Sequence, residues 1–341
     1  MAEPVVRVQG DGIAARCCLQ LLQQEGATDA VVKRGRPTLS ALVVSQSTQG
    51  LLADIFQAKD LLHGLPTIRK RFVAWRSGEP VVLPHFAVVA SEDILLERLR
   101  ARNTGTLDRT LSDPLWTIIA SRSVNNAPVE MHFGSRKAAV REVELIPEAE
   151  PDACWVESVE NGWLFLVATG NGRASLISAG DETEQLLDKS RLAARQVRKV
   201  DKRMVAEFPV YPRILSNLCG AGWLACGTAA MSFDPLCGEG AGHAAREAIL
   251  ACAAVRAILA GESAAEVLAE YSLRLMLGFL RHLESCRDFY LRDSPSAFWS
   301  SELRLIEQGI AWAKDWLSAA PPPRFRLIGF ALERYHPAER T

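Results

Sequence analysis

The chain has 341 residues, which is enough for two domains and a large core, and 48% of them are hydrophobic, which excludes global disorder. The formal net charge of −1 gives no reason to expect a nucleic acid or a membrane surface as partner. No apolar run is long enough to cross a membrane. The eight cysteines form no CxxC pair and the first residues lack a signal-peptide pattern, so we expect reduced thiols in a cytoplasmic protein.

The N-terminal segment reads as a strand, a glycine turn, a helix and a second strand. Val5–Gln9 leads into Gly10–Ala15 (GDGIAA), and Ala30–Lys33 is the second strand. A GxGxxA turn between a strand and a helix is a dinucleotide-binding fingerprint, because the glycines let a pyrophosphate approach the helix N-terminus. The acid that usually binds the ribose is replaced by Lys33, followed by Arg34. The ribose is then held otherwise, the affinity is lower, or a phosphate-bearing dinucleotide is preferred.

The middle of the chain alternates between helices and two β-rich inserts. Gly, Pro and Asn turns separate runs of alternating apolar and polar residues, which is typical of antiparallel strands. Ser91 before two acids predicts the start of a helix. The expected strands are Ile68–Trp75, Val81–Leu83, His85–Val89, Leu115–Ala120, Lys137–Leu145, Ala153–Glu157, Gly162–Thr169 and Arg173–Ala179, and the expected helices are Ser45–Leu62, Asp93–Arg102 and Glu182–Val197.

The most informative stretch is Gly222–Ile249. Its apolar run Trp223–Cys226 predicts a buried strand, four glycines and a proline then form an irregular loop, and a helix begins at Ala244 or slightly earlier. Glycines directly before a helix allow a ligand to approach backbone N–H groups, and the helix N-terminus favours negative charge. We therefore expect a cofactor here. The chain continues as helix over Ser263–Leu317 and ends in a predicted apolar helix, Phe325–Leu332.

This order of elements and motifs resembles the FAD-dependent monooxygenases of the p-hydroxybenzoate hydroxylase type and their tryptophan-halogenase-like relatives. Relatives of this group also modify protein side chains. Three places carry the resemblance: the GDGIAA turn, the strand ending at Ser121, and GTAA, FDP and GEG between Gly227 and Gly240. The family has Gly-Asp-Ala-Ala where this chain has Thr228 after the glycine, and it has a glycine that the Ser121 turn lacks.

The resemblance implies an α/β fold with a glutathione-reductase-like FAD-binding domain of the Rossmann type, an antiparallel β-sheet substrate domain and a helical C-terminal region. The expected limits are 1–45, 85–130 and 205–262 for the FAD-binding domain, 46–84 and 131–204 for the substrate domain, and 263–341 for the helical region. The Gly227 turn would lie along the ribityl chain, Asp234-Pro235 beside the flavin ring, and the helix N-terminus would stabilise the anionic reduced flavin. The cofactor-binding residues expected on this basis are Gly10, Gly12, Ile13, Ala14, Ala15, Lys33, Arg34, Gly227, Thr228, Asp234, Pro235, Gly238, Gly240 and Ala241.

The implied reaction is hydroxylation of a small molecule or a protein side chain by a flavin C4a-hydroperoxide, with O2 as co-substrate. NAD(P)H or a partner flavin reductase would supply electrons. No catalytic side chain is assigned; His243 and Glu239 are candidates, each weighed against a simple helix or loop role. The alternatives are a reductase of a double bond and a flavin-poor binding or accessory relative, which the substitutions at Lys33 and Thr228 favour.

Two other kinds of chemistry are disfavoured. The WxWxIP motif of flavin halogenases is absent, and the six histidines show no metal-binding spacing, so no metal site is expected. The tryptophans of the inserts, Trp75, Trp155 and Trp163, either pack in the core or line a substrate cavity.

Overall fold

The computed structural model describes residues 6–30, 37–75, 79–103, 114–121, 129–291 and 296–335. It begins with strand β1 (Val6–Gln9), helix α1 (Ile13–Leu21) and strand β2 (Thr28–Ala30), and β1 pairs with β2 in parallel. The predicted βαβ start is therefore confirmed. Lys33 and Arg34 lie outside the described residues.

A five-stranded sheet places the two predicted glycine turns at one edge. Its order is β14-β15-β6-β1-β2, with β14 (Cys219–Gly220), β15 (Trp223–Ala225) and β6 (Trp116–Ile119). Strands β15, β6, β1 and β2 run parallel, so their carboxyl ends share an edge. The turns that follow β1 and β15 meet there, at the kind of edge where open α/β sheets bind ligands.

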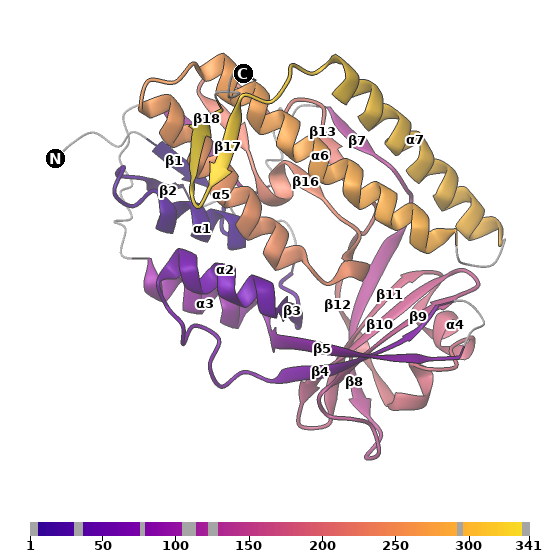
Figure 1. Ribbon diagram of the computed structural model, residues 1–341. Coiled ribbons are helices and arrows are strands. Elements are labelled where there is room, and N and C mark those ends of the chain that lie inside the picture. The colour runs from indigo at the N-terminus through magenta and orange to yellow at the C-terminus, as the bar shows by residue number, and fades with distance from the viewer. Residues whose placement is uncertain are drawn as a thin grey trace, which may run out of the picture.

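The second large sheet is mostly antiparallel and has eight strands in the order β12-β8-β11-β10-β9-β4-β5-β3. Only the β4–β9 pair is parallel among its described pairings. Figure 1 shows this sheet at the lower right, beside the five-stranded sheet and its helices. Its strands are β3 (Leu42–Ser45), β4 (Thr67–Ala74), β5 (Val81–Ala90), β8 (Lys137–Leu145), β9 (Ala153–Val159), β10 (Gly162–Gly170), β11 (Arg173–Gly180) and β12 (Val197–Pro209).

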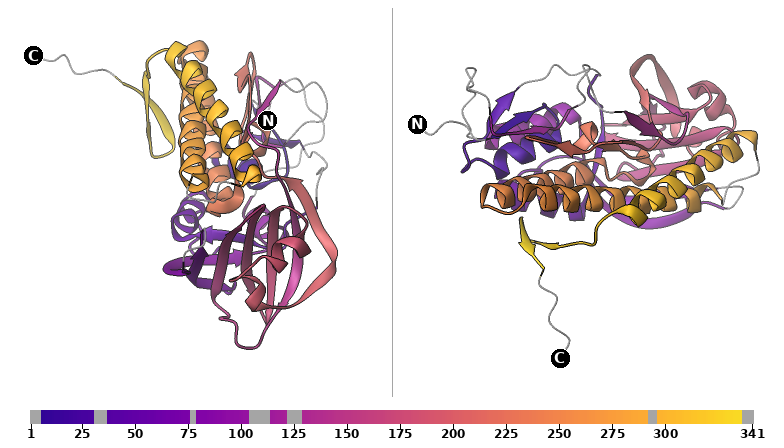
Figure 2. Two further views of the ribbon diagram at one scale, coloured as in Figure 1. Left: turned by 90° about the vertical axis from the view of Figure 1, so that its right-hand side faces the viewer. Right: turned by 90° about the horizontal axis from the view of Figure 1, so that it is seen from above.

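Three long helices, α5, α6 and α7, pack beside the two sheets (Figure 1). Helix α5 (Gly240–Leu259) packs against α1 and α2 (Gln46–Phe56), and α6 (Ala264–Tyr290) packs against α7 (Ala297–Ala319). Seen from above, α6 and α7 form a layer along one side of the molecule (Figure 2). None of the described helices is both long and apolar enough to cross a membrane. The smaller elements are α3 (Glu92–Arg102), α4 (Thr183–Asp188), β7 (Glu130–His132), β13 (Arg213–Leu215), β16 (Met231–Ser232), η1 (Ala194–Gln196), η2 (Gly227–Ala229) and η3 (Pro235–Cys237).

Helix α5 is buried on nearly every side because its residues are small. Ala245, Ala248, Ala251 and Ala253 have no exposed surface, so neighbouring backbones approach closely. A helix that is apolar all round belongs in the core, and one charged residue within it, Glu247, is buried as well. This helix therefore fixes the position of the loop that precedes it.

The last predicted helix, Phe325–Leu332, is wrong: the segment is a hairpin of β17 (Phe325–Ile328) and β18 (Ala331–Arg334). A short apolar run fits both periods, and here tertiary contacts decide. Phe325 is buried beneath the Arg334 guanidinium, which lies 4.8 Å from the ring centre.

The predicted helix Glu182–Val197 is also too long, since α4 ends at Asp188. The buried Glu157 carboxylate draws the following segment away from helical geometry: it accepts hydrogen bonds from the N–H groups of Arg191 at 2.7 Å and Ala193 at 2.9 Å. The strands expected separately at Val81–Leu83 and His85–Val89 are one strand, because β5 runs from Val81 to Ala90 through Pro84.

Candidate functional site

The glycine turn after β1 leaves open space in front of helix α1. The Asp11 N–H donates a hydrogen bond of 3.2 Å to Ser121 Oγ, which follows β6, so two strand ends are tied together. Gly12 is the N-cap of α1 and makes no side-chain capping bond, and a Cβ atom there would meet nothing within 4 Å. The first N–H groups of α1 therefore face room for an anion, with Ile13 at the first helical position.

The turn at Gly227 packs directly on helix α1. Gly227 has φ of 58°, and a Cβ atom at this position would lie 2.7 Å from the Cβ of Ala14. Only glycine fits, both in conformation and in space. Ala14 and Ala15 are buried in this contact region, while the next residue of the turn, Thr228, is exposed. The structure thus brings the two predicted motifs, more than 200 residues apart, into contact.

Helix α5 begins at Gly240, a little before the predicted Ala244. Its N-cap, Glu239, makes no side-chain capping bond, and a Cβ atom at Gly240 would meet nothing within 4 Å. The Gly238 Cβ would instead approach Arg71 Nη2 at 3.3 Å, and Ala241 is buried. The uncapped start of α5 is a second place where N–H groups and the helix dipole face open space.

A cavity of about 190 Å³ lies between this loop and the antiparallel sheet. Its floor is the predicted loop and its roof comes from β10 and β11 through Phe165, Val167, Ser175 and Ile177. Trp155 and Trp163 are buried in the core and do not line it. The predicted residues that line it are Gly227, Thr228, Asp234, Pro235, Gly238, Glu239, Gly240, Ala241 and His243.

Asp234 is held from the far side of the cavity wall. Its carboxylate lies 3.1 Å from Arg136 Nη2 with no exposed side-chain surface on either residue, and it also accepts a hydrogen bond from the Tyr290 hydroxyl. Arg136 reaches Glu302 Oε2 at 3.4 Å as well. Asp234 Oδ1 in turn caps the short turn that follows, accepting from the Leu236 N–H at 3.0 Å. Helices α6 and α7 thereby hold the loop through buried charges.

Two histidines flank Phe233 on this loop and are both neutral at physiological pH. Burial and Arg246 lower the pKa of His243 to about 4, and burial and His243 lower that of His282 to about 3. The His243 ring lies 4.0 Å from the Phe233 ring, and His282 Nε2 accepts the Asp234 N–H at 2.9 Å. His243 can accept or donate one hydrogen bond toward the cavity, but it carries no spare proton near pH 7.

The other candidate, Glu239, is tied to neighbouring side chains. Its Oε2 accepts from Thr48 Oγ1 at 3.2 Å and lies 3.7 Å from Arg246 Nη2. Nearby, Arg71 Nη2 lies 3.2 Å from His85 Nε2, and burial and Arg71 lower the pKa of His85. Through its contacts with Thr48 of α2 and Arg246 of α5, Glu239 links these two helices.

Sequence reasoning missed Glu247, Arg136, Tyr290 and Thr48. Arg136 and Tyr290 meet across 154 residues, so no local spacing could join them. Glu247 did leave a signal: it is the only acidic residue of the described α5, in a segment of alanine, leucine and isoleucine. A lone carboxyl group in an apolar buried helix indicates a special contact.

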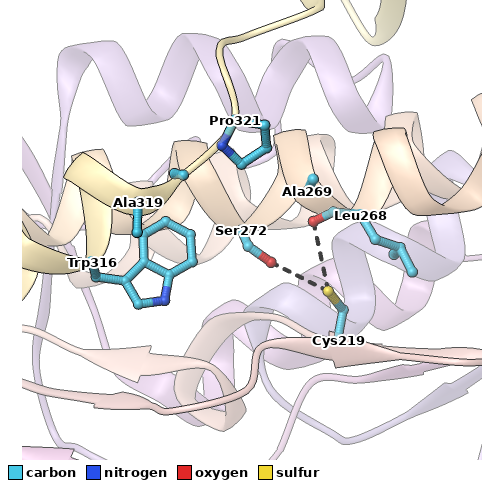
Figure 3. A pocket seen from close by; sticks show the side chains of 8 residues that line it. Cys219, Leu268, Ala269, Ser272, Trp316, Ala319 and Pro321 are labelled. Atoms are coloured by element: carbon cyan, nitrogen blue, oxygen red, sulfur yellow. Dashed lines mark hydrogen bonds between the residues drawn. The ribbon is translucent and has the colours of Figure 1, made fainter.

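A larger hollow of about 470 Å³ lies elsewhere, between α6, the end of α7 and β14. Figure 3 shows Cys219 in it, with its thiol hydrogen-bonded to Ser272 Oγ at 3.3 Å and the Leu268 carbonyl at 3.7 Å. Its other walls are apolar, including Trp316 and Pro321. None of the predicted cofactor residues lines this hollow, so the smaller cavity is the functional candidate.

Comparisons with known proteins rest on structure alone, because neither a protein-family model nor a curated protein matches the sequence. The peptidyl tryptophan dihydroxylase QhpG matches with a TM-score of 0.72 at 17% identity, over 98% of this chain and 86% of that one. The flavin-dependent halogenase CmlS matches with 0.71 at 18% identity, over 93% and 72%. HpxO of Klebsiella pneumoniae, solved in complex with FAD, matches with 0.60 at 16% identity, over 93% and 99%. The chain has the fold of the FAD-dependent monooxygenases and halogenases.

Proposed function

We propose that the protein is an FAD-dependent monooxygenase that hydroxylates an organic substrate, either a small molecule or a protein side chain. One observation carries this proposal: the Gly227 turn lies against Ala14, so the two motifs expected to hold the cofactor share one site. That site opens into a cavity roofed by an apolar sheet face. A site between a nucleotide-type turn and an apolar roof suits a flavin with an organic substrate above it.

The residues at two helix starts fit FAD. Open space at Gly12 and Gly240 lies in front of two helix starts without side-chain caps, which suits the pyrophosphate and an anionic ring edge. The cavity of about 190 Å³ is smaller than the roughly 300–1,000 Å³ of typical ligand pockets. We therefore assign the cavity to the flavin ring with its ribityl chain, and the open side of Gly12 to the pyrophosphate.

Bound FAD, once reduced, supplies activation of O2 and transfer of one oxygen atom to the substrate. The chain's own part is positioning and electrostatics. The α5 N-terminus stabilises negative charge beside Gly240, and Phe165 and Ile177 exclude water from the cavity. His243 stays neutral and positions a polar group by one hydrogen bond, and Glu239 holds the α5 start against Thr48.

The electron donor in this proposal is NAD(P)H or a partner flavin reductase. We place the protein in the cytoplasm, since the seven cysteines with described side chains are free thiols. We retain the expected division into an FAD-binding domain, a substrate domain and a helical region as part of the proposal. Tyr290 of α6 donates a hydrogen bond to Asp234, and Glu302 of α7 pairs with Arg136, the cation beside Asp234, so the helical region has a role in holding the loop before α5.

Purified protein tests the proposal directly. A yellow preparation, or colourless protein that becomes yellow with added FAD and retains it through gel filtration, supports a flavoprotein. NADPH-driven oxygen uptake, alone or with an added flavin reductase, then separates a monooxygenase from a double-bond reductase. Protein that takes up no FAD at any concentration would instead identify a binding or accessory protein, the reading that Thr228 favours.

A further inference from the structure

A buried carboxyl group in the cavity wall has an unused oxygen atom. Glu247 lies two turns into α5, is 7% exposed and lines the cavity. Its Oε2 atom has no hydrogen-bond partner among the described residues. A buried carboxyl oxygen without a partner is costly, so its presence calls for a partner that the described residues do not supply.

Glu247 lies directly behind the turn where the family's aspartate is missing. The Gly227 backbone lies close enough to the Glu247 carboxyl group to lower its pKa, and Gly227 precedes Thr228, which stands where the resemblance expects an acid. The Thr228 carbonyl is itself occupied, accepting from Arg213 Nη2 at 2.7 Å. A carboxyl group is thus present at this turn although position 228 has none, and it belongs to Glu247 of the neighbouring helix α5.

The protonation state of Glu247 suits a hydroxyl partner. Burial raises its pKa to about 8, against the opposing effects of the Gly227 N–H, Arg246 and Arg213. At neutral pH the group therefore keeps its proton and can both donate and accept. A sugar-alcohol hydroxyl also both donates and accepts a hydrogen bond. A phosphate or a flavin carbonyl would only accept one from the protonated Glu247 carboxyl group.

We propose that Glu247 supplies from α5 the carboxyl group that Thr228 lacks, and that this carboxyl group hydrogen-bonds a hydroxyl of the FAD ribityl chain. The inference rests on the proposed function, because it assumes that FAD binds in this cavity. It explains how a chain with threonine at position 228 holds a flavin. Glu247 is then a cofactor-binding residue that the motif alone does not identify.

The test measures FAD affinity by quenching of flavin fluorescence on titration with apoprotein, independently of turnover. Glu247→Met removes the carboxyl group but keeps the side-chain volume, and it should weaken FAD binding about tenfold, the value of one hydrogen bond. Glu247→Gln, which can still donate and accept, should stay within about threefold of the natural chain. Thr228→Asp added to Glu247→Met should restore most of the loss. Glu270→Gln, at a buried glutamate outside the cavity, serves as the control and should change nothing.

The outcomes separate the two proposals. If the natural chain binds no FAD, the proposed function fails. If it binds FAD and the folded Glu247→Met variant binds equally well, this inference fails alone. Infrared difference spectra give a second measurement: the C=O stretch of the protonated Glu247, identified by its loss in Glu247→Gln, should shift when FAD is added. An unmoved stretch overturns the inference even if Glu247→Met does not fold.

Discussion

The Asp234 carboxylate and the Arg136 guanidinium lie 3.1 Å apart with no side-chain surface exposed to solvent. Arg136 comes directly before β8 of the antiparallel sheet, and Asp234 belongs to the loop between β16 and η3. Because Arg136 also pairs with Glu302 of α7, one cation joins the sheet, the loop before α5 and helix α7. The loop is therefore positioned by charges that its own sequence contains only in part.

Replacing Arg136 with methionine should destabilise the fold by about 3–5 kcal/mol, because two buried carboxylates would lose their cation. Urea unfolding followed by circular dichroism measures the change. Arg173→Ala provides the comparison, since its partners Glu142 and Asp201 are partly exposed, and it should cost less than about 1 kcal/mol. Equal losses of unfolding free energy in the two variants would show that the buried ion pair contributes no more to stability than the partly exposed one.

Glu247 should make the protein less stable as the pH rises. Its pKa is about 8 in the folded chain, against an ordinary 4.5, so between these values the folded state binds more protons than the unfolded state. Stability then falls with pH across this window, by roughly 4 kcal/mol in all. Glu247→Gln should remove this slope, so its advantage over the natural chain should grow from pH 5 to pH 8 in thermal melts without added FAD. A constant difference would contradict the burial of an unpaired carboxyl group.

His243 should act in the opposite direction. Its pKa is about 4 in the folded chain, against an ordinary 6.5, so the unfolded chain takes up the proton first as the pH falls. Stability is lost between pH 6.5 and 4, by about 2–3 kcal/mol. His243→Gln should be less sensitive to acid in this range, whereas His63→Gln, at an exposed histidine, should behave like the natural chain.

Gly12→Ala should separate folding from cofactor binding. The backbone at Gly12 is extended and its Cβ would meet no protein atom within 4 Å, so the fold should tolerate the change. The methyl group would occupy the space assigned to the pyrophosphate, and FAD affinity should fall at least tenfold in fluorescence titrations. Gly50→Ala, in α2 with equal free space, is the matched control and should leave affinity unchanged.

Thr228→Asp in the natural background should tighten FAD binding only modestly if Glu247 already serves the ribityl chain, and by less than it does in Glu247→Met. Both affinities come from the same titrations, so the comparison forms a double-mutant cycle. An identical gain in both backgrounds would show that the two positions act independently.

Local patterns were enough for part of the fold. The strand, glycine turn and helix at the N-terminus follow from residues close in sequence, and the same holds for β8 to β11 with their Gly and Asn turns. The loop before α5 was identifiable because glycine spacing limits which backbones can approach a ligand. The segment 325–332 failed because its apolar spacing suits helix and strand alike, and only its packing beneath Arg334 selects the hairpin.

The polar part of the site could not be read from the sequence in the same way. The sequence predicts that Asp234 passes beside the flavin ring or caps its loop, but it does not indicate the partners of the Asp234 carboxylate, Arg136 and Tyr290, which come from two other parts of the chain. Glu247 acquires its meaning only from burial and from the Gly227 N–H. Pairings of this kind depend on tertiary structure, so no motif encodes them.

The contacts of Asp234 also set an order of events in the life of the protein. Tyr290 and Glu302, which complete the buried cluster around Arg136, belong to α6 and α7 and are synthesised after Asp234. Until α6 and α7 have been made and docked, Asp234 lacks its partner Tyr290 and Arg136 lacks its partner Glu302. The cluster that holds the loop therefore gains its last member, Glu302, only after a further 68 residues (234 to 302) have been synthesised.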